Sequence, residues 1–205
     1  MEIGIVLYDG FDELDAIGPY EVFEYALSNG ADATVTLYAL DEREWVTASH
    51  GLRVGVDGVL PPADADDRPE LLVVPGGGWV AKPPEASAWA EAQKGALPDA
   101  IASYHESGAT LAAVCTGGML LAAAGVIDGQ RAITHGGAIG ELAESGAEIV
   151  RRRVVDDGDI VTAGGVTSGI DLALHIVERE FGAAIAEATA TVMEYDRRTD
   201  PYARK

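Results

Sequence analysis

The sequence predicts an α/β fold in which helices cover both faces of a mostly parallel β-sheet. Short apolar, β-branched runs alternate along the 205-residue chain with segments whose apolar residues repeat at helical spacing. Hydrophobic residues make up 48% of the chain, enough for one continuous core. No repeat, linker or low-complexity run divides the sequence, so we expect a single domain over residues 1–205.

The first half of the chain predicts three core strands, one helix, a hairpin and a helical region. The strands are apolar and rich in β-branched residues, and the first helix ends on Gly30, a residue type that commonly follows a helix. The expected elements are strands at 2–8, 33–40 and 70–78, a helix at 18–30, a hairpin at 44–60 and helical segments over 84–107 interrupted near Pro98.

The second half continues the alternation and closes with two helices. A strand at 109–114 meets Cys115, and a helix begins near Gly117. The remaining expected elements are a strand at 130–135, a helix at 137–146, two strands around an Asp-Asp-Gly-Asp turn in 148–165, and helices at 167–182 and 183–195.

The chain is strongly acidic, with 34 Asp and Glu against 14 Lys and Arg and a net charge of −20. Such a surface repels phosphate backbones, so nucleic acid is not an expected partner. Acidic residues spread along the whole chain are typical of adaptation to high salt, where self-repulsion is screened within about 3 Å at molar ionic strength. The sequence therefore indicates a halophilic protein.

The N-terminus and the cysteine content indicate a cytoplasmic protein without a membrane segment. The chain opens directly on a strand pattern rather than on a signal peptide, and a lone cysteine suits a reducing compartment. Residues 107–127 carry no charge, but the glycines and the Cys-Thr-Gly-Gly turn within them favour a buried strand and helix over a membrane span. No ligand spacing predicts a metal site, and we expect no cofactor.

Cys115 lies between a strand and a helix, which is the layout of a nucleophile elbow. The amides and dipole at the N-terminus of the following helix predict a thiol pKa below its usual value. Gly117 and Gly118 leave the approach to the sulfur open. The alternative is a buried structural cysteine, because free cysteine is among the most buried residue types.

Two further loops reach the same carboxyl edge of the predicted sheet, where α/β proteins place their chemistry. Residues 73–79 end a strand in glycines whose N–H groups, with the amide of Thr116, could form an oxyanion hole; the alternative is a plain tight turn. Residues 9–18 contain Asp15, flanked by apolar side chains that would raise its pKa and suit a proton donor. The alternative for Asp15 is a helix N-cap.

Of the four histidines, His135 is the candidate site residue, because it ends a predicted strand just before two glycines and could face the crevice. The other three are expected to be structural or surface residues.

Several stretches together resemble the ThiJ/PfpI superfamily of class I glutamine-amidotransferase-like proteins, which includes the parkinsonism-associated deglycase. They are "LDAIGPYEVF", "LLVVPGGG", "AAVCTGGMLLAAAGVIDGQRAITH" and "RVVDDGDIVTAGGVTSGIDLALHIVE". The resemblance implies a flavodoxin-like three-layer sandwich, a homodimer and a small-molecule substrate. It places the nucleophile at Cys115, its acidic partner at Asp15, an oxyanion glycine at Gly77 and a nearby histidine at His135.

Within the superfamily, the motifs are most similar to those of isonitrile hydratases and of the amidase-like domains of AraC-type regulators. Thr116 stands where protease-like and many glyoxalase-like members carry histidine, which argues against peptidase activity. We expect a cysteine-dependent hydratase or hydrolase in which Cys115 attacks, Asp15 moves the proton, Thr116 orients the acid or the substrate, and Gly77 and the Thr116 amide stabilise negative charge. The alternatives are a glyoxalase or deglycase acting on 2-oxoaldehydes such as methylglyoxal, and a non-enzymatic redox sensor with an oxidisable cysteine.

Overall fold

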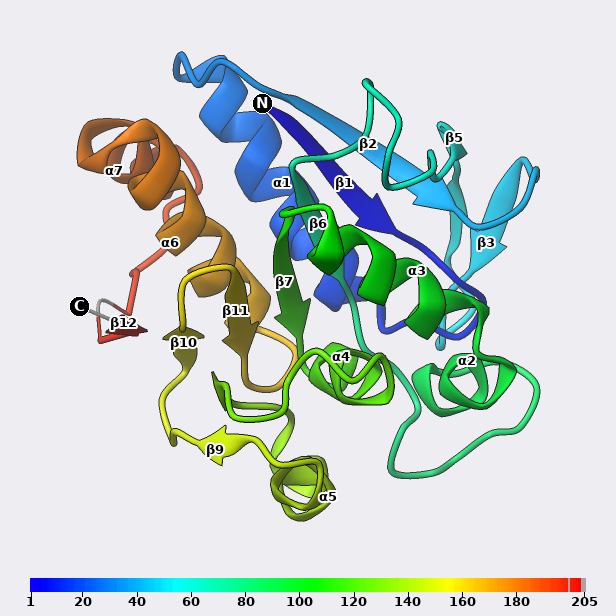
Figure 1. Ribbon diagram of the computed structural model, residues 1–205. Coiled ribbons are helices and arrows are strands. Elements are labelled where there is room, and N and C mark those ends of the chain that lie inside the picture. The colour runs from blue at the N-terminus through cyan, green and yellow to red at the C-terminus, as the bar shows by residue number, and fades with distance from the viewer. Residues whose placement is uncertain (199, 204–205) are drawn as a thin grey trace.

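A computed structural model describes residues 1–198 and 200–203 and contains an eight-stranded sheet between two groups of helices (Figure 1). The strand order is β12-β10-β11-β7-β6-β1-β2-β5, and neighbours from β11 to β5 run parallel, whereas β10 is antiparallel to β11. The predicted α/β, flavodoxin-like sandwich is therefore confirmed. The predicted single domain of residues 1–205 includes positions 199, 204 and 205, which lie outside the described residues. The strands of this sheet are β1 (Glu2–Val6), β2 (Thr34–Ala39), β5 (Gly58–Val59), β6 (Leu71–Val74), β7 (Thr110–Val114), β10 (Val154–Asp156), β11 (Ile160–Ala163) and β12 (Tyr202–Ala203).

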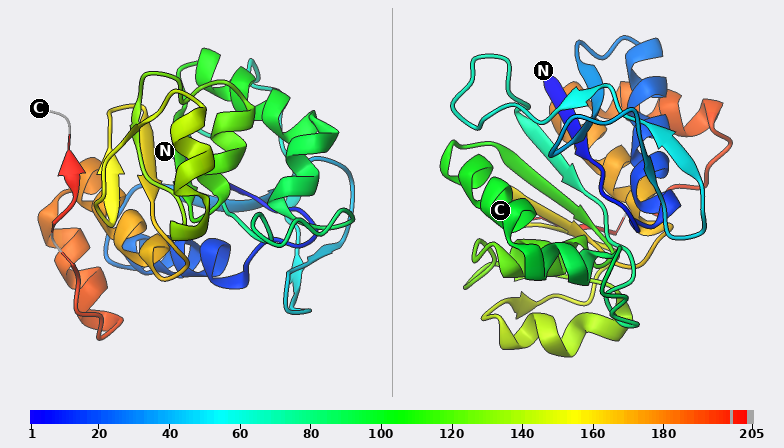
Figure 2. Two further views of the ribbon diagram at one scale, coloured as in Figure 1. Left: turned by 90° about the horizontal axis from the view of Figure 1, so that it is seen from below. Right: turned by 90° about the vertical axis from the view of Figure 1, so that its right-hand side faces the viewer.

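The helices form one layer on each face of the sheet. Figure 2 shows α1, α6 and α7 together on one side, and α2, α3 and α4 on the other with α5 packed outside α4. The helical region predicted at 84–107 breaks at Gly95, with φ +85°, and not near Pro98. Pro98 lies in the first turn of α3, where a missing N–H does not interrupt the helix. The helices are α1 (Glu13–Ser28), α2 (Ala88–Lys94), α3 (Ala96–Glu106), α4 (Gly117–Ala123), α5 (Ile139–Glu144), α6 (Ser168–Phe181) and α7 (Ala183–Val192).

The first helix begins earlier than the sequence predicts. Apolar periodicity starts near residue 18, but α1 begins at Glu13, with Asp12 at the N-cap position. Its first turn carries Glu13 and Asp15, and carboxylates are favourable there because they face the positive end of the helix dipole. Asp15 therefore lies inside the helix, and the alternative in which it caps the helix is wrong.

Two sequence predictions about short strands are wrong in part. β3 (Trp45–Thr47) and β4 (Arg53–Gly55) form the expected hairpin, whereas β5 leaves it and pairs with β2. The strand predicted at 130–135 is only β8 (Arg131–Ala132), which pairs with β9 (Glu148–Ile149) in a separate two-stranded sheet.

Directly after β8 the backbone forms a hydrogen bond with a side chain instead of with another strand. The N–H of Ile133 donates to Thr162 Oγ1 at 3.0 Å. His135 consequently does not end a strand of the main sheet. It precedes the 3₁₀ turn η1 (Gly136–Ala138), which leads into α5.

The uncharged residues 107–127 include β7, the turn at Cys115 and α4. The strand β7 is packed inside the core. In the part of the chain that the structure describes, none of the helices combines the length and the apolar character needed to cross a membrane.

Candidate active site

Cys115 occupies a strained turn between β7 and α4. Its φ is +55°, a conformation that costs a non-glycine residue about 1–3 kcal/mol and persists only where the surroundings hold it. The N–H of Cys115 donates to Gly164 O at 2.9 Å, and its carbonyl accepts the hydroxyl of Thr134 at 2.7 Å. A Cβ at Gly117 would lie 2.1 Å from Val74 O, so this position requires glycine. The predicted nucleophile elbow is confirmed.

The three loops expected at the carboxyl edge of the sheet come together around this elbow. The loop after β6 is bonded to the start of α1 in both directions: Asp12 N donates to Gly76 O at 2.8 Å, and Gly76 N donates to Asp15 Oδ2 at 3.0 Å. The same loop is bonded to the elbow, because Gly77 N donates to Thr116 Oγ1 at 2.9 Å. Residues far apart in sequence thus form one hydrogen-bonded site.

Asp15 is a fully buried carboxyl with one unpartnered oxygen. Its exposed fraction is 0%, and Oδ1 has no hydrogen-bond partner among the described residues. Burial raises the pKa of Asp15 to about 8, and the charge of Asp12 adds to this, against the opposing effects of the Gly76 N–H and the Cys115 thiol. The predicted rise is confirmed. At neutral pH a pKa of about 8 favours the protonated carboxyl, and no N–H of the described residues reaches Oδ1.

The Cys115 thiol is also buried, with 6% of the residue exposed. Burial raises its pKa to about 12, with a further contribution from the charge of Asp15, although the backbone N–H groups of Val166 and Thr116 lower it. The expected lowering of the thiol pKa is therefore wrong, because desolvation outweighs the amides around the sulfur. The thiol and the carboxyl titrate as a coupled pair. The sulfur loses its proton more easily when Asp15 is protonated than when Asp15 is charged, because the charge of Asp15 raises the pKa of the thiol.

Val166 is a site residue that the sequence analysis did not single out. It has φ +35° and follows β11, so that its N–H faces the sulfur from the neighbouring strand end. The sequence contains a pattern that could have indicated Val166. The stretch "AGGVTSG" at 163–169 joins a strand to a helix through glycines, as the stretch around Cys115 does.

Thr116 and Gly77 are bonded to each other in this structure. Thr116 is 3% exposed, and its hydroxyl accepts the Gly77 N–H, so that amide already has a partner. Gly77 can donate to an oxyanion only after this bond opens, and its oxyanion role stays a prediction. Thr116 holds the same loop whose Gly76 N–H contacts Asp15.

His135 lies in the wall beside the elbow. Its Nδ1 accepts the N–H of Gly137 at 3.1 Å, so the neutral ring carries its proton on Nε2. The ring edge lies against Gly165, where a Cβ would be 2.8 Å from His135 Cδ2. Among the hydrogen bonds of the described residues, none joins His135 to Cys115 or Asp15. Its catalytic role stays a prediction.

Asp15 should make the folded state less stable as the pH rises from about 4 to about 8. Its pKa is 3.8 in the ordinary state and about 8 when buried, so between these values the folded chain binds one more proton than the unfolded chain. One bound proton gives a slope of about −1.4 kcal/mol per pH unit in the free energy of unfolding. Asp15→Asn removes this contribution. Urea unfolding should therefore show the variant gaining stability relative to the wild type between about pH 5 and pH 8, and a constant difference would contradict the assignment.

Comparison with known proteins agrees with the predicted resemblance. Residues 1–179 match the DJ-1/PfpI family. Over 197 residues the chain is 34% identical to the isonitrile hydratase of Pseudomonas putida. This match covers 95% of this chain and 78% of that protein. It is 28% identical over 166 residues to a deglycase of Thermococcus kodakarensis, covering 80% of this chain and 89% of the deglycase.

The fold agrees as well. The crystal structure of a ThiJ/PfpI family protein from Pseudomonas syringae superposes with a TM-score of 0.82 at 26% identity, covering 96% of this chain and 76% of that one. The cysteine elbow, the parallel sheet and the sequence match point to the same conclusion: the chain belongs to the DJ-1/PfpI family.

Proposed function

We propose that the protein is a cysteine-dependent hydratase that converts isonitriles to N-substituted formamides. One observation carries the proposal: the buried carboxyl of Asp15 lies beside the thiol on the elbow, with its pKa raised to about 8 by burial, and its Oδ1 has no hydrogen-bond partner in the described part of the chain. Hydration of an isonitrile needs both a nucleophile and a proton for the same carbon atom. The similarity to an isonitrile hydratase supports this choice of substrate.

The paired groups of Cys115 and Asp15 can carry out the reaction in two balanced steps. In the first, the sulfur forms a bond to the isonitrile carbon while Asp15 passes its proton to that carbon and takes the thiol proton, which gives a thioimidate. In the second, water adds to the same carbon and the nitrogen takes one proton. The C–S bond then breaks, the sulfur regains a proton, and the formamide leaves. Asp15 relays each proton and ends in its starting state.

The backbone around the pair supplies positioning and electrostatic support. The N–H groups of Thr116 and Val166 face the sulfur and stabilise negative charge that develops on it as its proton leaves. The Thr116 hydroxyl fixes the loop that holds Asp15, so the acid and the nucleophile keep their relative positions. Burial of both groups excludes competing water from the first step.

A second candidate is a glyoxalase or deglycase acting on 2-oxoaldehydes, which the similarity to a deglycase supports. In the glyoxalase reaction the sulfur adds to the aldehyde carbon, and a proton then moves between adjacent carbons. Asp15 is the carboxyl available for this transfer, and His135 would have to leave its bond with Gly137 to assist. Pairing with a second copy of the chain stays a prediction from the family resemblance.

The test is a direct comparison of the two substrates with the wild-type protein. We expect an aryl isonitrile to give its N-aryl formamide, identified by mass spectrometry, with a higher kcat/KM than that for loss of methylglyoxal. Efficient consumption of methylglyoxal without formamide production would reverse the ranking. In that case His135→Ala should abolish the activity that remains.

A further inference from the structure

A cluster of arginines lines a small cavity away from Cys115. The cavity has a volume of about 280 Å³ and is lined by Arg151, Arg152, Arg153 and Arg198, with Asp200 as its one acidic side chain. These are four of the 14 lysine and arginine residues in a chain whose net charge is −20. The first three lie between β9 and β10, and Arg198 follows α7, so the cluster is created by the fold.

The carboxylates around the cavity are too few to neutralise it. Arg152 pairs with Asp200 at 3.1 Å, and Arg153 pairs through Nε with the buried Asp171. In the described part of the chain, the side chains of Arg151 and Arg198 form no ion pair. Two arginines that have no carboxylate partner among the described residues therefore line the cavity together with two that have one each.

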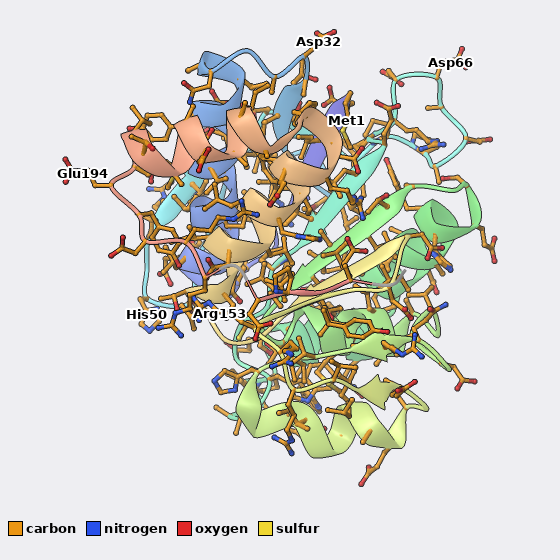
Figure 3. All side chains as sticks on the ribbon, turned by 90° about the vertical axis from the view of Figure 1, so that its left-hand side faces the viewer. Met1, Asp32, His50, Asp66, Arg153 and Glu194 are labelled. Carbon is orange, nitrogen blue, oxygen red and sulfur yellow. The ribbon has the colours of Figure 1, made fainter. Side chains whose placement is uncertain are left out.

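Arg153 gives this cavity a fixed wall. Its backbone carbonyl accepts the N–H of Gly164 at 3.0 Å, and its Nη2 donates to Thr167 Oγ1 at 3.0 Å. Figure 3 labels Arg153 at the end of α6 where these contacts lie. Asp171, which binds Nε, also accepts from the Tyr195 hydroxyl at 2.9 Å and from Arg198 N at 3.0 Å. The carboxylate is thus occupied on both oxygens, and Arg153 is held in place where it lines the cavity.

Chemistry and size together define what such a cavity can hold. Planar guanidinium groups bind oxyanions through pairs of parallel N–H donors, and arginine is the preferred residue for phosphate. A volume of 280 Å³ lies below the usual range for drug-sized ligands, about 300–1,000 Å³, but accommodates a phosphate group with a short substituent. Like charges gathered without a ligand repel one another, so an anion would relieve the repulsion.

We propose that this cavity binds a small anion through its phosphate group, either inorganic phosphate or a short phosphate monoester. The site goes beyond the proposed hydratase activity, and none of its lining residues belongs to the pair at Cys115 and Asp15.

Thermal unfolding in inorganic phosphate tests the proposal, with ionic strength held constant by KCl because a chain of net charge −20 responds to salt in general. The wild-type Tm should rise with phosphate concentration as expected for a ligand that binds only the folded state. In the double variant Arg151→Gln/Arg198→Gln the Kd for phosphate, measured by calorimetry, should be at least about tenfold weaker. The control is Arg53→Gln, whose guanidinium lies over the Trp45 ring at 3.7 Å on the β3–β4 hairpin, and it should retain wild-type binding.

Thermal unfolding in glycerol phosphate, with glycerol as its control, distinguishes a site for a phosphate monoester from a site for inorganic phosphate. A rise in Tm with the ester, or with inorganic phosphate alone, supports the site and identifies its ligand. The proposal is overturned if neither inorganic phosphate nor glycerol phosphate raises the Tm above its value in chloride at matched ionic strength, or if the double variant binds the active ligand as the wild type does. It is also overturned if the double variant changes self-association while phosphate has no effect, since the arginines would then pair with the acidic surface of a second copy.

Discussion

Replacement of Cys115 by serine should reduce formamide production on the order of 10⁴-fold or more, because the serine hydroxyl is a far weaker nucleophile than the sulfur it replaces. The fold should persist. Serine is close to cysteine in size, and the bonds that hold the elbow, from Cys115 N to Gly164 O and from the Thr134 hydroxyl to Cys115 O, involve only the backbone of residue 115. The measurements are the rate of product formation and the Tm.

A Cys115→Ser protein that turns over both substrates at wild-type rates would contradict the assignment of the nucleophile. The experiment also separates the redox alternative. If the wild type turns over neither substrate, yet gains two oxygen atoms in peroxide and Cys115→Ser does not, the cysteine acts as an oxidisable sensor.

Replacement of Asp15 by asparagine should reduce isonitrile hydration by about 10²–10⁴-fold, because the variant loses its proton donor but keeps an oxygen to accept the Gly76 N–H. In the wild type, kcat/KM should fall as the pH rises through about 8, since the acid form of Asp15 is lost there. The residual activity of the variant should lack this fall. A pH profile of formamide production from an aryl isonitrile measures both effects.

Asp12→Asn is the matched control for Asp15→Asn. Asp12 lies three residues earlier, at the N-cap position of α1, and its side chain makes no capping hydrogen bond. Because its charge raises the pKa of Asp15, its removal should shift the midpoint of the pH profile downward and leave the maximal rate near that of the wild type. If Asp12→Asn and Asp15→Asn lose the same activity, the effect is one of charge near the site and not of a specific proton donor.

The strand, turn and helix around Cys115 could be predicted from the sequence because the conformation of this turn is determined locally. A strand, one cysteine, a Gly-Gly pair and a helix-forming run allow few backbone arrangements, and the φ of +55° at Cys115 is the one that joins them. The nearness of Asp15 to Cys115 was also predicted, but through the order of elements and the family resemblance. Asp15 precedes Cys115 by 100 residues, and only the parallel sheet brings both to one edge.

The properties that depend on neighbours from other elements were decided by the tertiary structure. The local argument from the α4 N-terminus predicted a lowered thiol pKa, whereas burial by surrounding elements raises it. A local apolar pattern predicted a strand ending at His135, but a strand requires a partner strand. After Ala132 the backbone N–H of Ile133 donates a hydrogen bond to the Thr162 side chain instead.

The sequence by itself determined the layered fold and the cysteine on its strained turn, because strand, helix and glycine preferences act over a few consecutive residues. Only the tertiary structure decided that Asp15 is enclosed with one oxygen that has no partner among the described residues, that Val166 faces the sulfur, and that Arg198 joins Arg151, Arg152 and Arg153 around one cavity. Desolvation and charge interactions depend on distances through space, and these distances exist only once the distant parts of the chain have packed together.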